Sequence, residues 1–346
     1  MRRSRPAVVV ASVAVVVVTS ALCALTMSAC GTATNVTTAP QAKPFKVMLD
    51  WFPNADHAPL YTALANGYFK AVGLDVEPVV PSETAEPLKL LATGKVDMAI
   101  SYEPELLLAR DEGLKLVSVG ALVQRPLTSI IALPGHGVQS VADLAHMKVG
   151  TAGIPYQRAE LQTALRKAKV NEKSVQEVNV GFNLVPAMLS GRVAATLGGY
   201  WNYEALQLQL LGKHPVVIPV DKAGVPNYDE LVLVVREEQA RRDGQDLRAF
   251  LQALTRGERA ARANPDAAAE LLVKANPSLE KKLQAESIRQ TLPATQPANA
   301  KDPYGWQEPS AWAGFGAWML SQGLVHHNPN GGLPPFTNEY LPGQGI

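Results

Sequence analysis

Short apolar runs alternate with stretches of helical spacing through the first part of the chain. A short apolar run bounded by turn residues predicts a buried strand, whereas apolar residues three and four apart predict an amphipathic helix. The predicted strands cover residues 45–49, 74–80, 96–100, 116–123 and 128–133, and the predicted helices cover 58–72, 86–93 and 104–112. This strand–helix–strand order predicts a mostly parallel sheet covered by helices.

The same alternation starts again further along the chain. Strands are predicted at 148–150, 175–180, 194–197 and 216–220, and helices at 141–144, 158–168 and 184–190. After an apolar run at 230–236, the last third is predicted to hold helices at 246–263, 265–275, 279–291 and 309–322. The predicted fold class is therefore α/β, with a second α/β unit inserted into the first.

The two units predict two lobes joined by two crossing segments. We expect residues 45–133 and 231–346 in the first lobe and residues 134–230 in the second, with crossings near 130–133 and 231–235. Small-molecule sites form preferentially between domains, and hinge closure around a ligand is a known motion of such folds. The cleft between the lobes is therefore the expected binding site.

The N-terminus has the pattern of a secretory signal. A basic start with Arg2, Arg3 and Arg5 is followed by 19 mostly apolar residues at 7–25 and then by small residues. Residues 27–31, Met-Ser-Ala-Cys-Gly, resemble the bacterial lipobox, which implies a signal at 1–29, a lipid on Cys30 and a polar tether at 30–44. The alternative is an uncleaved membrane anchor, because the apolar stretch approaches the length of a spanning helix. In both cases the folded part is expected at the extracytoplasmic face of the membrane.

Composition excludes several classes of function. Without its three signal arginines the chain keeps 29 of its 32 basic residues against 31 acidic ones, so the mature net charge is −2. Nucleic-acid binding needs a basic surface and is not expected. The two cysteines are Cys23 in the signal and Cys30, which leaves no thiol for a disulfide, a metal site or catalysis. We expect no metal, no cofactor and no catalytic residue.

Residues 49–61 form the first candidate binding segment. They follow the first predicted strand, and ligands of open α/β sheets bind beyond the carboxyl ends of the strands. Trp51 and Phe52 would leave large apolar surfaces in a loop unless a ligand stacks there, and Asn54 adds a polar group beside them. The alternative is that Trp51 and Phe52 fill the core while Asn54 caps the next helix.

Two further segments follow predicted strands of the second unit. Residues 197–204, Leu-Gly-Gly-Tyr-Trp-Asn-Tyr-Glu, combine two glycines, three aromatic rings and Glu204. Aromatic faces with a carboxylate acceptor suit a flat heterocycle that bears an amine. The alternative is an aromatic helix face packed inward with Glu204 in solvent. Residues 150–156, a loop of small residues that ends at Tyr156, open the next helix and form a third candidate.

Several segments together resemble the bacterial lipoproteins that bind thiamine-pyrimidine precursors for ABC importers. The resemblance is carried by residues 49–61, 67–76, 94–98, 101–110, 121–126, 181–188, 200–204 and 221–231. It implies a type II periplasmic-binding-protein fold, an importer permease as partner, a monomer, and a pyrimidine held between the lobes by aromatic stacking and an acidic side chain. The ligand-binding residues then expected are Trp51, Asn54, His57, Tyr102, Tyr156, Tyr200, Trp201 and Glu204.

The same superfamily leaves alternatives open. Relatives carry riboflavin, sulfonates or nitrate, and a fungal relative makes the thiamine pyrimidine with a lysine-bound pyridoxal phosphate, a donor histidine and a cysteine-rich iron-binding run. His57 matches a family histidine. However, Ser101 stands at the position of the pyridoxal lysine, Glu105 replaces the histidine one turn later, and residues 231–235 replace the cysteine run. These departures favour a binding protein over an enzyme.

Overall fold

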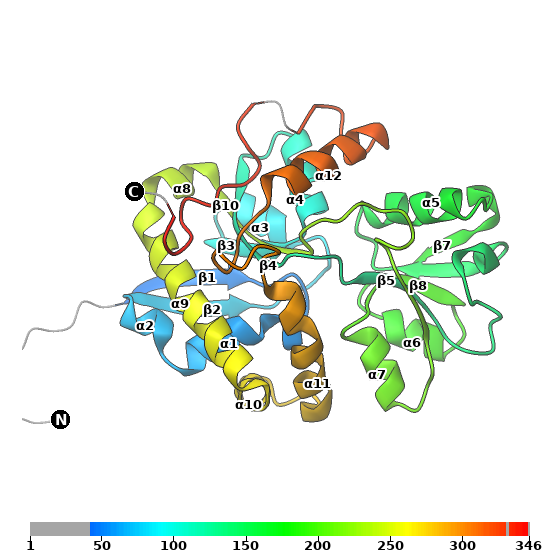
Figure 1. Cartoon of the computed structure of the whole chain (residues 1–346), viewed down its shortest axis with the longest axis horizontal. Coiled ribbons are helices and arrows are strands. Elements are labelled where there is room, and N and C mark those ends of the chain that lie inside the picture. Colours follow the sequence, from blue (N-terminus) through cyan, green and yellow to red (C-terminus); the bar gives the residue numbers. More distant parts are fainter. Residues whose placement is uncertain (1–41, 330–331, 345–346) are drawn as a thin grey trace, which may run out of the picture. The chain divides into compact units, whose positions relative to one another are not determined.

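The computed structural model describes residues 42–329 and 332–344. The described residues belong to one compact unit, whose strands make two five-stranded sheets (Figure 1). The predicted signal, Cys30 and most of the tether lie outside the described residues. The tether predicted at 30–44 ends earlier than expected. Lys43 and Pro44 are the first residues of a strand and pair with Leu74 and Asp75.

The first sheet has the order β2-β1-β3-β10-β4. Its strands are β1 (Lys43–Met48), β2 (Leu74–Val79), β3 (Met98–Ser101), β4 (Leu116–Val123) and β10 (Leu231–Arg236). β1 runs parallel to both β2 and β3, so these three carboxyl ends meet at one edge. β10 returns from the second sheet and runs antiparallel to β3 and β4, which makes the sheet mixed.

The second sheet repeats this arrangement with the order β7-β6-β8-β5-β9. Its strands are β5 (Thr128–Ala132), β6 (Lys148–Thr151), β7 (Gln176–Asn179), β8 (Ala195–Tyr200) and β9 (Val216–Pro219). β6 is parallel to β7 and β8, and β5 is antiparallel to β8 and β9. We call the parts built on the first and second sheets the first lobe and the second lobe.

The crossings between the lobes differ from the prediction. Residues 130–133 were expected to cross, but 130–132 lie within β5 of the second sheet, so the first crossing is residues 124–127. Residues 231–235 lie wholly within β10 of the first sheet, so the second crossing is residues 220–230. Both runs are fully buried strands, and burial alone does not reveal to which of two sheets a strand belongs.

Helices cover the sheets of both lobes (Figure 1). Those of the second lobe are α5 (Gln157–Lys167), α6 (Leu184–Leu189) and α7 (Glu204–Leu210), with short 3-10 helices η2 (Val141–Leu144) and η3 (Glu172–Ser174). The first lobe begins with η1 (Ala55–His57), α1 (Ala58–Ala65), α2 (Tyr68–Ala71), α3 (Pro87–Ala92) and α4 (Glu103–Asp111). The single helix predicted at 58–72 is broken because Gly67 takes a left-handed conformation with φ 68°.

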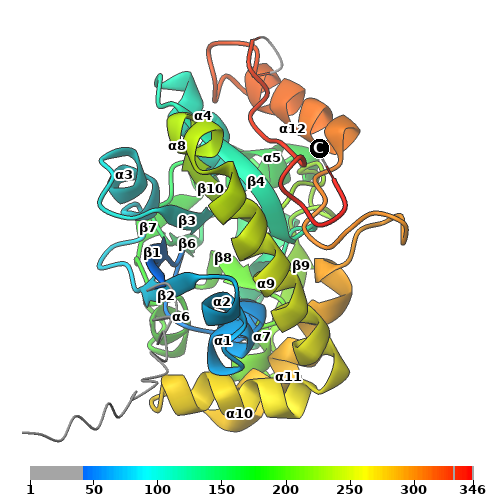
Figure 2. The same ribbon diagram turned by 90° about the vertical axis from the view of Figure 1, so that its left-hand side faces the viewer.

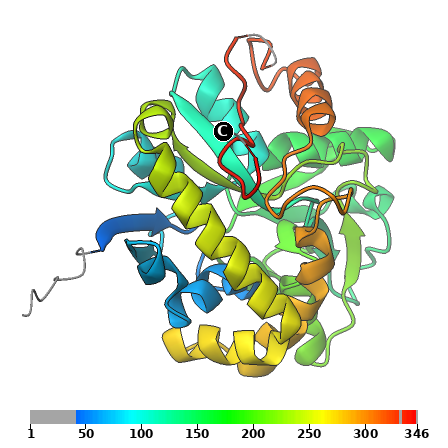
Figure 3. The ribbon, with the colours of Figure 1, turned by 60° about the vertical axis from the view of Figure 1, so that its left-hand side comes forward.

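The last third adds α8 (Glu237–Arg242), α9 (Gly244–Ala263), α10 (Pro265–Ala275), α11 (Lys281–Thr291), η4 (Leu292–Thr295) and α12 (Pro309–Ser321). The long helix α9 runs beside α1 and α2 (Figures 2 and 3). Gly257 allows the closest approach, since a Cβ atom there would lie 2.2 Å from the carbonyl oxygen of Pro59. α9 thereby fixes the start of α1, which follows the candidate loop after β1. None of the helices in the described residues is long and apolar enough to cross a membrane.

Candidate binding site

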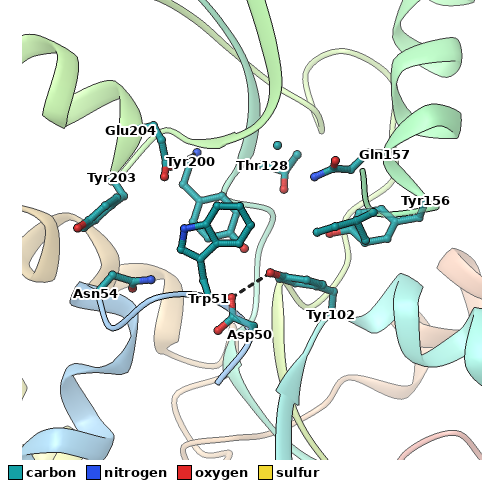
Figure 4. A pocket seen from close by; sticks show the side chains of 12 residues that line it. Asp50, Trp51, Asn54, Tyr102, Thr128, Tyr156, Gln157, Tyr200, Tyr203 and Glu204 are labelled. Atoms are coloured by element: carbon teal, nitrogen blue, oxygen red, sulfur yellow. Dashed lines mark hydrogen bonds between the residues drawn. The ribbon is translucent and has the colours of Figure 1, made fainter. Parts of the chain in front are cut away.

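A cavity lies between the two lobes, where loops from both sheets face one another (Figure 4). Its lining consists of Asp50, Trp51, Asn54, Tyr102, Thr128, Ile154, Tyr156, Gln157, Gly198, Tyr200, Tyr203 and Glu204. About 390 Å³ of space is free of atoms, but the centre of a water molecule can reach only about 20 Å³ of it. A larger ligand therefore enters or leaves only when side chains or lobes move.

The first lobe supplies one side of the cavity from the ends of two adjacent parallel strands. Asp50, Trp51 and Asn54 follow β1, and Tyr102 follows β3. The hydroxyl of Tyr102 donates a hydrogen bond of 3.0 Å to Oδ2 of Asp50. This bond, drawn in Figure 4, fixes an almost fully buried carboxylate at the floor of the site.

His57 lies behind Asp50 and does not line the cavity. Its Nδ1 accepts from the backbone N–H of Asn54 at 3.2 Å, and its Nε2 lies 2.8 Å from Oδ1 of Asp50. Because Nδ1 is an acceptor, the ring hydrogen is on Nε2 and points at the carboxylate. His57 therefore orients Asp50 from outside the cavity.

The second lobe supplies the opposite side from the ends of β6 and β8. Tyr200, Tyr203 and Glu204 come from β8 and the turn into α7. Oε2 of Glu204 accepts from the backbone N–H of Tyr200 at 2.7 Å. Burial raises the pKa of Glu204 to about 7, while the bonds from backbone N–H groups oppose this change. Near neutral pH the carboxyl can therefore exist in either protonation state.

Gly198 allows a close approach within the second lobe. Its φ is 106°, and a Cβ atom there would lie 2.4 Å from Nε2 of Gln157. Gln157 also accepts from the backbone N–H of Ala152 at 2.9 Å through Oε1. The glycine thus makes room for the Gln157 amide in the cavity wall.

Aromatic rings from both lobes surround this space. The rings of Tyr102 in the first lobe and Tyr156 in the second lie 5.8 Å apart at 59°. Trp51 packs against hydrophobic clusters of both lobes. The lobes also make a polar contact. The hydroxyl of Thr84 in the first lobe donates to the carbonyl oxygen of Ala152 in the second at 3.1 Å.

Six of the eight residues predicted from the sequence line the cavity: Trp51, Asn54, Tyr102, Tyr156, Tyr200 and Glu204. His57 is one layer behind, and the Trp201 indole donates to the carbonyl oxygen of Pro126 at 3.1 Å in the first crossing. The other six lining residues were not among the binding residues expected from the sequence: Asp50, Thr128, Ile154, Gln157, Gly198 and Tyr203. Asp50, Ile154, Gly198 and Tyr203 do fall in the candidate segments, so proximity along the chain was a usable signal for these four.

The charge of the lining is one-sided. Asp50 and Glu204 are acidic, and none of the lining residues, all within the described part of the chain, is Lys, Arg or His. Carboxylates accept hydrogen bonds and favour donors or cations. The cavity therefore complements an aromatic group that carries N–H donors better than it complements an anion.

Two α/β lobes with a lined cleft between them define a periplasmic-binding-protein fold. The structure of the periplasmic aliphatic sulphonate-binding protein SsuA from Escherichia coli is similar, with a TM-score of 0.64 and 17% identity over 83% of this chain and 94% of that chain. The fold predicted from the sequence is thereby confirmed.

The chain belongs to the NMT1/THI5-like family, which it matches over residues 54–268. It is 38% identical to the formylaminopyrimidine-binding protein of Halalkalibacterium halodurans over 79% of this chain and 84% of the relative. It is also 37% identical to a putative thiamine biosynthesis protein of Haemophilus influenzae, over 71% and 78% of the two chains. These relatives confirm the family resemblance.

Proposed function

We propose that this protein is the extracytoplasmic substrate-binding component of an ABC importer, and that it captures an amino-substituted pyrimidine precursor of thiamine. The observation that carries the proposal is a cavity walled by aromatic rings. Asp50 of the first lobe and Glu204 of the second both line it, and the lining contains no basic side chain. The relative that binds a formylaminopyrimidine supports the same ligand class.

The residues divide the work by chemistry. The indole of Trp51 offers the largest face for stacking on a flat ring, and Tyr102, Tyr156 and Tyr200 enclose the ring's edges. Glu204 from the second lobe accepts from an exocyclic amine or a protonated ring nitrogen, and Asp50 from the first lobe accepts from a second donor. A ligand that contacts both lobes favours the closed form through those differential contacts.

The same lining argues against anionic ligands. Sulfonates, nitrate and phosphate esters are bound through basic side chains or clustered N–H donors, and this lining presents two carboxylates. The substrate proposed is accordingly an uncharged or cationic pyrimidine of the aminomethyl, hydroxymethyl or formylaminomethyl type, without a phosphate.

The protein's own residues also argue against the pyrimidine-synthase alternative. At the position of the pyridoxal lysine, the buried hydroxyl of Ser101 donates to Oε2 of Glu105 at 2.5 Å. Neither residue has an amine that could form a Schiff base. We therefore propose a non-catalytic role, with a lipid at Cys30 as membrane anchor, an importer permease as partner, and a monomer as the binding unit.

A ligand panel tests this function. Purified protein is first denatured gently, and any released small molecule is identified by mass spectrometry. Ligand-free protein is then screened by thermal shift with aminomethyl-, hydroxymethyl- and formylaminomethyl-pyrimidines, their phosphate esters, taurine and nitrate. Binding to the folded state alone adds about 2.7 kcal/mol at a hundredfold excess over Kd. We expect stabilisation by the unphosphorylated pyrimidines; stabilisation by taurine or nitrate alone would refute the assignment.

A further inference from the structure

A second hollow adjoins the cavity on the solvent side. It shares Trp51, Asn54, Tyr203 and Glu204 with the cavity, and it is lined in addition mainly by apolar residues of both lobes. The centre of a water molecule can reach about 740 Å³ of this hollow, compared with about 20 Å³ of the cavity. The shared side chains therefore lie between the small cavity and the larger hollow.

Phe182 of the second lobe covers Trp51 on the side of this hollow. It lies between β7 and α6, and its ring centroid is 4.4 Å from that of Trp51 with the planes at 80°. The same ring lies 4.5 Å from Phe52, whose side chain is 47% exposed. Trp51 and Phe52 belong to the first lobe, so the three rings form an aromatic contact between lobes.

This contact links lobe closure to the orientation of the indole. An edge-to-face pair holds both rings at a defined angle, and here one ring comes from each lobe. If the lobes separate, Phe182 moves away from Trp51, and the indole loses its ring contact with the second lobe. When they close, Phe182 presses on the edge of the ring whose face we assign to ligand stacking.

We propose that Phe182 is a positioning residue of the binding site, which locks Trp51 over the bound ring and delays the ligand's release through the outer hollow. The part of this inference that concerns a ligand rests on the proposed function. The part that concerns Trp51 does not, because the ring contact exists in the protein alone.

The ligand-independent test uses acrylamide quenching of tryptophan fluorescence in the full-length protein. Phe182→Ala should make Trp51 more accessible to the quencher. The increase should be absent when Phe182→Ala is introduced into a Trp51→Phe background, because the remaining tryptophans are not covered by Phe182. Leu189→Ala is the matched control, since Leu189 lines the same hollow and is already 44% exposed. Unchanged quenching in Phe182→Ala would overturn the proposal.

The kinetic test uses an aminomethyl-pyrimidine in stopped-flow binding. Loss of an aromatic pair and its buried area should raise the dissociation rate roughly fivefold to thirtyfold. The association rate should change little, and Phe182→Tyr should restore most of the residence time. Equal rates in wild type and Phe182→Ala would overturn the role in release. If no pyrimidine binds to wild type, the proposed function fails, whereas the quenching result still decides whether Phe182 positions Trp51.

Discussion

Glu204 shows at the scale of one residue how position gives a side chain its chemistry. It begins α7 after the short turn that follows β8, and its carboxylate already accepts one backbone N–H bond from Tyr200. Oxygen lone pairs remain available for a ligand, and burial in the closed cleft strengthens any bond to a charged donor. The residue therefore has its orientation fixed before a ligand arrives.

Glu204→Gln should weaken pyrimidine binding about tenfold to a hundredfold, because a charge-assisted bond contributes roughly 1.5–3 kcal/mol. The amide oxygen still accepts from Tyr200, so the melting temperature without ligand should not fall. Trp51→Ala should cost a similar or larger loss of affinity, and Trp51→Phe should keep part of it. Titration calorimetry and thermal unfolding without ligand measure the two quantities.

The matched control is Glu112→Gln, an exposed residue at the end of α4, which should leave affinity unchanged. These side chains would belong to the core if both Glu204→Gln and Trp51→Ala bound the ligand normally. The same would follow if the variants lowered the melting temperature without ligand but left affinity unchanged.

The residues that the sequence predicted are those whose type is unusual for a loop. Trp51, Tyr200 and Glu204 are large aromatic or acidic side chains at or just beyond the ends of apolar strands, and each lines the cavity. Asp50 was missed because one aspartate after a strand is common, and its partners His57 and Tyr102 are brought to it only by the fold. Thr128 and Gln157 carried no signal, since polar residues of this kind occur throughout the surface.

At the scale of elements, the two crossings are joined by a buried carboxylate. Glu230 ends the second crossing, and its Oε2 accepts from the backbone N–H groups of Leu127 at 2.6 Å and Thr128 at 2.8 Å. Its Oε1 accepts from the Thr128 hydroxyl at 2.9 Å. Burial raises the pKa of Glu230 to about 7, although these bonds oppose the change.

Glu230→Gln should reduce the dependence of stability on pH. The raised pKa means that the folded state holds a proton which the unfolded chain releases near pH 4.5. The stabilisation from this proton is fully present below about pH 4.5 and is lost as the pH rises to about 7. A glutamine keeps acceptors and donors for the same partners but does not titrate. Thermal unfolding of both proteins between pH 5 and pH 8 measures the effect.

Between pH 8 and pH 5, the free energy of unfolding of wild type should rise by roughly 1–3 kcal/mol more than that of the variant. Wild type and Glu230→Gln with parallel pH profiles would contradict a titrating role for this carboxyl. Glu112→Gln again serves as control and should follow wild type.

The crossings also show where sequence patterns stop being informative about elements. The strands and most helices could be predicted because their apolar spacing is clear, as in α9 and α10. The run 128–133 was correctly predicted to be a strand, but it was assigned to the wrong lobe. Pairing with β8 and β9 is decided by contacts between segments far apart in the chain, which local patterning does not encode.

For the whole molecule, the fold gives a site that forms only when both lobes contribute. The membrane anchor proposed at Cys30 would keep that site at the outer surface of the membrane, on a tether that ends where β1 begins at Lys43. Attachment to the same membrane raises the effective concentration of a binding protein near its permease. Anchoring is therefore part of how the importer would collect scarce ligand.

Cys30→Ser should release the protein from the membrane fraction or leave its signal uncleaved. A serine lacks the thiol that takes the diacylglyceryl group, and one polar residue does not hold a folded protein on a bilayer. Cys23→Ser is the matched control, because Cys23 lies in the segment proposed to be removed as a signal and should not affect anchoring. Fractionation locates each variant, and intact-mass analysis of the membrane form identifies its N-terminus. An unmodified chain that begins at Met1 in the membrane fraction would replace the lipid anchor with an uncleaved apolar segment at 7–25.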